Sequence, residues 1–91
     1  MSLVARFHPS NLTAEKYDET HPKLEAIGFP PDGLDYHVAF GSDGALSVSE
    51  IWDSREQMEA WGAKLMPVLA EAGIEFAGPP EVLEAHNIVK R

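Results

Sequence analysis

Two alternating runs of residues on either side of a short turn predict a β-hairpin at Tyr36–Trp52, whose sequence is YHVAFGSDGALSVSEIW. Alternation with a period of two is typical of β-strands. Ser42-Asp43-Gly44 between the runs supplies the residue types that tight turns prefer. We therefore expect one strand at about residues 35–41 and a second at residues 45–52.

Two registers are compatible with this hairpin, and they differ by one residue. If Asp43-Gly44 is the centre of a two-residue type I′ turn, His37 lies directly opposite Glu50, where an ion pair can form. If Ser42-Asp43-Gly44 is a three-residue loop with a glycine bulge, the large apolar side chains separate better from the small and polar ones. A one-residue shift moves every side chain of the second strand to the other face of the sheet.

The better separation favours the three-residue loop, which is our prediction. In that register Glu50 is the single misfit on its face. The predicted apolar face carries Tyr36, Val38, Phe40, Leu46, Val48 and Trp52. The predicted small and polar face carries His37, Ala39, Gly41, Ser47, Ser49 and Ile51.

The rest of the chain predicts two helices and two further strands. A short strand at residues 3–8 ends before Pro9, and a final strand is expected at residues 82–89. Thr13 is the predicted N-cap of a helix that runs to residue 27 and ends at Gly28. Ser54 caps a second helix in a capping box with Gln57, and that helix ends at Gly73.

This order, β-α-β-β-α-β, predicts an α+β fold of the ferredoxin-like type with a four-stranded antiparallel sheet. The 91 residues, 1–91, fit a single domain. Two helices cover only one face of such a sheet, and neither face of the hairpin looks fully solvated. A second copy of the chain is the simplest cover for the other face, so we expect a homodimer.

Composition excludes several partners and compartments. The net charge of −8 argues against binding to nucleic acid or to an anionic membrane surface. The chain contains no cysteine, which argues against disulfides and thiolate zinc sites and makes the cytoplasm the expected location. The sequence shows neither a signal peptide nor an apolar run long enough for a membrane helix.

The run VSEIWDSREQMEAW at residues 48–61 resembles the dimeric α+β barrel superfamily, especially its antibiotic-biosynthesis-monooxygenase-like branch. The similarity lies in a strand that ends in Glu-x-Trp, followed by an acidic residue, a serine and a helix with aromatic residues. LMPVLAEAGI at residues 65–74 and HNIV at residues 86–89 extend it over most of the chain. The resemblance implies a barrel made of two four-stranded sheets, with a cavity between each sheet and its own helices.

The implied cavity predicts a small-molecule site between sheet and helices. His37 is the candidate general base, because imidazole titrates near neutral pH. Glu50, Trp61, Tyr36 and Asn87 are side chains that could stabilise a substrate carbanion, as the resemblance implies. The predicted ligand-binding residues are Tyr17, His21, Ser47, Ser49, Trp61 and Leu65.

No cofactor or metal is expected at this site. The four histidines show no metal-binding motif, and the helix after Trp61 contains no histidine before Gly73, where haem-degrading members of the superfamily carry an iron ligand. The resemblance therefore implies a cofactor-independent monooxygenase-like or proton-transfer enzyme that acts on an aromatic or polyketide-like compound. The alternative is a non-catalytic ligand-binding or interaction protein, because a shared fold does not specify a reaction.

Overall fold

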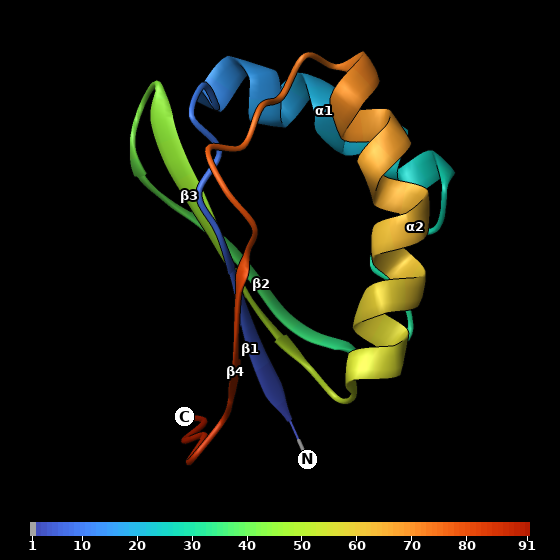
Figure 1. Ribbon diagram of the computed structural model, residues 1–91, viewed down its shortest axis with the longest axis vertical. Helices are drawn as coiled ribbons and strands as arrows, with labels where there is room; N and C mark the ends of the chain where they lie inside the picture. Colours follow the sequence, from blue (N-terminus) through green and yellow to red (C-terminus); the bar gives the residue numbers. More distant parts are fainter. Residues whose placement is uncertain (1) are drawn as a thin grey trace.

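A computed structural model describes residues 2–91 of the chain and confirms the predicted order of elements (Figure 1). The sheet is antiparallel throughout, in the strand order β2-β3-β1-β4. The elements are β1 (Leu3–Phe7), α1 (Ala14–Ala26), β2 (Leu34–Ser42), β3 (Ala45–Trp52), α2 (Arg55–Glu71) and β4 (Glu81–Glu84).

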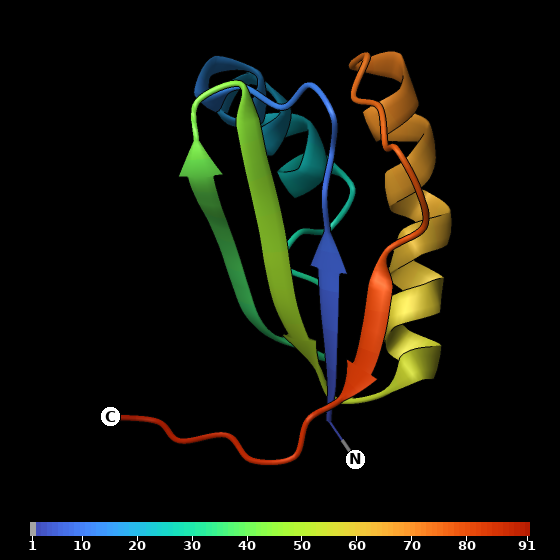
Figure 2. The same cartoon turned by 60° about the vertical axis from the view of Figure 1, so that its left-hand side comes forward.

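Both helices lie on the same face of the sheet, and the opposite face carries no helix (Figure 1, Figure 2). Side chains of α1 and α2 therefore meet the residues of the strands that point inward. No helix in the part of the chain that the structure describes is long and apolar enough to cross a membrane.

The helix ends follow the local sequence as predicted. The Thr13 side chain accepts a hydrogen bond from the backbone N–H of Lys16, and Ser54 accepts one from Gln57. Gly28 has a φ of 108° directly after α1, where the left-handed conformation favours glycine. These contacts depend on residues close in sequence, which is why the pattern alone predicted them.

The predicted register of the hairpin is wrong. Ser42 pairs with Ala45, so the loop has two residues, and His37 pairs with Glu50. The turn also differs from type I′, since Gly44 has a φ of 87° while Asp43 keeps a negative φ. The shift moves Ser47 and Ser49 to the outer face, beside Tyr36, Val38 and Phe40. It moves Leu46, Val48, Glu50 and Trp52 to the inner face, beside His37.

The tip of the hairpin explains this register. The Asp43 carboxylate accepts a hydrogen bond of 2.8 Å from the backbone N–H of Ala14, in the first turn of α1. The backbone N–H of Leu46 donates to the carbonyl of Leu12 just before that helix. An anion at a helix N-terminus is stabilising, so the tip is held by α1 rather than by its own turn chemistry alone.

The core lies between the inner face of the sheet and the helices. Ala5 and Trp52 are fully buried, and Trp61 of α2 is almost so. A bulge at Asp35 changes the alternation of β2, so Leu34 pairs with Trp52 and packs against this core. Burial of these side chains is the main source of stability in so small a domain.

The last strand is shorter than predicted. β4 ends at Glu84, so His86 and Asn87 lie in the tail that follows it and not in the sheet. The tail leads away from β4 (Figure 2), and Lys90 near its end makes an ion pair of 3.2 Å with Asp35 at the start of β2. The contact with Asp35 holds the tail near the far edge of the sheet, where no pattern in the sequence predicted it.

Candidate functional site

A chain of hydrogen bonds joins α1, β2 and β3 at the inner face of the sheet. The Tyr17 hydroxyl is 2.9 Å from Nε2 of His37. The other ring nitrogen of His37, Nδ1, is 2.6 Å from Oε2 of Glu50. Because β2 and β3 pair His37 with Glu50, the sheet itself holds the two side chains face to face.

Glu50 is the buried anion of this network. Only 4% of the residue is exposed, and its second oxygen accepts a hydrogen bond of 3.1 Å from the indole N–H of Trp52. A carboxylate is rarely buried unless it is paired and hydrogen-bonded. His37 and Trp52 supply those partners, one to each oxygen of the carboxylate.

Tyr17 keeps its phenolic proton well above neutral pH. Burial raises the pKa of the Tyr17 hydroxyl, and the nearby carboxylates of Asp18 and Glu50 raise it further. When Oε2 of Glu50 accepts a hydrogen bond from the Nδ1–H of His37, Nε2 of the neutral ring is left as an acceptor for the Tyr17 O–H. The network thus orders one tautomer of His37.

Aromatic rings enclose the histidine. Phe29 lies edge-on to His37 with 5.2 Å between ring centroids, and it packs against Trp61 at 6.0 Å. Tyr17 is stacked on His37 at 6.0 Å. These rings limit the access of water to the imidazole, which strengthens the electrostatic interactions within the network.

Two adjoining hollows lie between the sheet and the helices. Tyr17, His37 and Glu50 border the inner hollow, which is small at about 70 Å³. The second hollow, at about 310 Å³, lies along α2 and the segment at residues 78–80, and is large enough for the body of a small ligand. The residues that border both are Phe7, Glu50, Trp61, Leu65 and Phe76.

The structure brings together five of the predicted site residues. The inner hollow is bordered by Tyr17, His37, Glu50, Trp61 and Leu65. His21 lies at the edge of the site, partly exposed, with Nδ1 3.5 Å from a carboxylate oxygen of Glu25.

Ser47 and Ser49 do not enter the hollow, and this corrects the expectation that they would. The two-residue loop places both on the outer face. Tyr36 also points outward, and Asn87 lies in the tail. The predicted pocket face depended on the register, so the error in the register placed the residues of β3 on the wrong faces.

Glu50 is the site residue to which the sequence reasoning gave too little weight. It was the misfit of the preferred register. The signal that could have identified it was its position opposite His37 in the two-residue alternative. Glu50 did not fit the apolar face of the preferred register because it is a buried carboxylate that faces an imidazole. The choice of that register took only the packing of apolar side chains into account.

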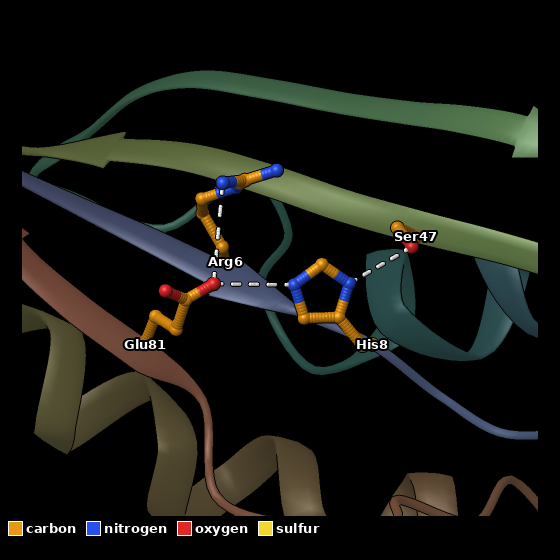
Figure 3. A network of polar contacts seen from close by, with 4 residues as sticks. All are labelled: Arg6, His8, Ser47 and Glu81. Carbon is orange, nitrogen blue, oxygen red and sulfur yellow. Dashed lines mark hydrogen bonds and ion pairs between the residues drawn. The ribbon is translucent and has the colours of Figure 1, made fainter.

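A second polar network lies on the outer face (Figure 3). His8 is 3.1 Å from the Ser47 hydroxyl and 3.3 Å from a carboxylate oxygen of Glu81, which also lies 3.9 Å from Arg6. About half of the His8 and Glu81 side chains is exposed. This network borders neither hollow, and exposed pairs of this kind contribute little to stability.

Acidic and histidine side chains do not cluster as a metal site requires. Among residues 2–91, no group of three or more histidine, aspartate or glutamate side chains is arranged to hold a metal ion. The donor set of the inner network, one imidazole and one carboxylate, is already joined by a short hydrogen bond.

Comparison with known proteins shows similarity of structure without similarity of sequence. No sequence model of a protein family matches the chain, and no curated protein matches it with significance. The protein YJCS matches with a TM-score of 0.69 and 13% identity, over 94% of this chain and 100% of that one. SnoaB, a cofactor-independent oxygenase from Streptomyces nogalater, matches with a TM-score of 0.65 and 13% identity, over 99% and 96% of the two chains.

A candidate antibiotic biosynthesis monooxygenase from Caulobacter crescentus matches with a TM-score of 0.62 and 21% identity, over 94% of this chain and 89% of that one. Matches at this level of identity establish the fold and leave the reaction open. The chain therefore shares its ferredoxin-like fold with these solved structures, and this is the fold that the sequence predicted.

Proposed function

We propose that this chain is a cofactor-independent, oxygenase-like enzyme that begins by removing a proton from an aromatic or polyketide-like compound. The observation that carries the proposal is the Tyr17–His37–Glu50 network at the border of an otherwise apolar hollow. SnoaB, whose structure is similar to that of this chain, is a cofactor-independent oxygenase, and this similarity supports the choice of reaction class.

His37 is the proton acceptor in this proposal. Glu50 accepts a hydrogen bond from Nδ1 and would stabilise the imidazolium that forms when Nε2 gains a proton. The ligand anion left behind is rich in electrons and can react directly with O₂. At an activated CH₂ group, one O₂ supplies the oxygen of the ketone product and the oxygen of the water released, so no external reductant is required.

The direct test is oxygen uptake by the wild-type protein on a panel of aromatic diols, quinols and cyclic enols whose keto forms carry an activated CH₂ group. We expect uptake that is lost in the His37→Ala variant and retained in His8→Ala, a matched histidine variant on the outer face. Circular dichroism would verify that both variants fold. Full turnover by a folded His37→Ala protein would contradict the role of His37, and no uptake by the wild type on any compound would favour a protein that only binds its ligand.

We also propose that the protein is a cytoplasmic homodimer that uses the outer face of the sheet. Tyr36, Val38 and Leu83 are each about half exposed there, at 50%, 48% and 53%. Together with Phe40 they make an apolar surface that no helix of this chain covers (Figure 1). Apolar sheet surfaces of this kind are typical of interfaces, and a twofold dimer would cover the same surface on both copies.

A further inference from the structure

The Tyr17–His37–Glu50 network leaves one of its members free to meet a ligand. Both ring nitrogens of His37 already have partners, namely the Tyr17 hydroxyl and Glu50. Both oxygens of Glu50 accept hydrogen bonds, from His37 and Trp52. The Tyr17 hydroxyl makes one hydrogen bond within residues 2–91, to His37, and a phenol can take part in a further one.

From this geometry we propose that the Tyr17 hydroxyl, rather than the His37 ring, contacts the ligand, and that the site takes a neutral phenol or enol whose hydroxyl proton passes inward through Tyr17 to His37. This inference rests on the proposed function, because it names the substrate class and the contact residue of the same site.

The proton transfer balances without any other reagent. The ligand O–H proton moves to the Tyr17 oxygen while the proton of Tyr17 moves to Nε2 of His37. The products are a ligand oxyanion, a neutral tyrosine, and an imidazolium that faces the Glu50 carboxylate 2.6 Å away. In the reverse direction Tyr17 becomes a donor toward the ligand, so the proton on His37 decides whether Tyr17 accepts or donates.

The lining of the hollows selects the class of ligand. No lysine or arginine borders either of the two hollows described here, and Glu50 borders both. A ligand carboxylate or phosphate would therefore face a buried negative charge without a cation to offset it. The aromatic rings of Phe29 and Trp61 favour a flat apolar body instead.

The contact by Tyr17 is testable without turnover, with 2-naphthol as the probe. We expect wild-type protein to bind 2-naphthol about tenfold more tightly than 2-methoxynaphthalene, which has no hydroxyl proton, since one hydrogen bond in an apolar site has this effect. The preference should disappear in Tyr17→Phe, and 2-naphthoate should bind more weakly than 2-naphthol. Titration calorimetry measures all three affinities.

The variant His37→Gln separates the two residues. Glutamine offers Tyr17 an acceptor but is no base, so this variant should keep the preference for 2-naphthol and lose oxygen uptake. The proposal is overturned if Tyr17→Phe keeps the preference while His37→Gln loses it, because the ligand would then contact the ring. If the wild-type protein takes up no oxygen, the proposed function is wrong. The binding of 2-naphthol by Tyr17 can still be tested, because that measurement requires no turnover.

A second measurement covers the case in which Tyr17→Phe fails to fold. The chain has two tyrosines, so 3-fluorotyrosine incorporated into the Tyr36→Phe variant labels Tyr17 alone. Addition of 2-naphthol should shift the single fluorine resonance, and 2-methoxynaphthalene should shift it less. An unchanged resonance under saturating 2-naphthol would show that the ligand does not reach Tyr17.

Discussion

Nδ1 of His37 lies 2.6 Å from Oε2 of Glu50 across the hydrogen-bonded strands β2 and β3, and the glutamate is almost completely buried. The pair links the stability of the fold to the chemistry of the site. The imidazole needs the carboxylate as a partner for its ring N–H, and the carboxylate needs the imidazole because it has almost no contact with water.

Replacement of Glu50 by alanine should destabilise the fold by about 2 kcal/mol or more, since the His37 ring and the Trp52 indole N–H would both lose an acceptor. Urea unfolding measures the change. Glu19→Ala is the matched control on the solvent side of α1 and should cost less than about 1 kcal/mol, because Glu19 is exposed. Equal losses in the two variants would show that the burial of Glu50 carries no particular cost.

The raised pKa of Tyr17 predicts a loss of stability at alkaline pH. A group whose pKa is higher in the folded state stabilises the fold below its unfolded pKa of about 10, and this contribution disappears as the pH rises through the folded pKa. In the Tyr36→Phe variant, absorbance at the wavelength of tyrosinate should show Tyr17 ionising above pH 10. Ionisation at the pH of free tyrosine would contradict the burial of this phenol.

Asp43 should stabilise the start of α1, although the two are far apart in sequence. The variant Asp43→Ala removes the acceptor for the Ala14 N–H and should cost about 0.5–2 kcal/mol, the range for lost helix caps. Asp43→Asn keeps an acceptor oxygen and should lose less. Thermal unfolding of the two variants gives the comparison, and identical losses would mean that only the charge at the helix end matters.

The outer face of the sheet should mediate dimerisation. In analytical ultracentrifugation at micromolar concentration, the wild-type protein should have twice its chain mass of 10.0 kDa. Val38→Asp should shift the protein toward the monomer, because a buried unpaired carboxylate opposes association. Ala63→Asp at an exposed position of α2, on the other side of the molecule, is the control and should leave the mass unchanged. A wild-type monomer under these conditions would exclude the proposed dimer.

Trp52 anchors the core beneath the site. It is fully buried and its indole N–H donates to Glu50, so Trp52→Ala should cost about 3–5 kcal/mol and leave a cavity. Trp52→Phe keeps most of the packing and should cost less. The difference in the free energy of unfolding between the two variants, measured in urea, separates the contribution of packing from that of the hydrogen bond. If Trp52→Ala were as stable as the wild type, Trp52 would not be a central part of the core.

The helices and their ends could be read from the sequence because their signals are local. Thr13 and Ser54 cap the helices through backbone groups three residues away, and Gly28 ends α1 in the conformation that glycine adopts at least cost. The element order followed from these boundaries. The last strand was predicted too long, because its length depends on pairing with β1, which its own residues do not encode.

The candidate site was predictable only in part. His37, Tyr17 and Trp61 were assigned to a cavity that the resemblance to the superfamily implied, and they do border one hollow. Ser47 and Ser49 were misplaced, because sorting side chains by polarity fails for a sheet whose outer face carries both large apolar and polar side chains. The pattern of apolar and polar residues therefore could not show which face of the hairpin points toward the helices.

The sequence by itself determined the order of the elements, the ends of the helices and the identity of the polar residues near the core, since each depends on neighbours along the chain. The tertiary structure decided the register of β2 against β3, and with it the pairing of His37 with Glu50. The reason is physical. Two registers one residue apart have similar local energies, and contacts with distant groups, the Ala14 N–H at the tip and Trp52 beside the buried carboxylate, select between them.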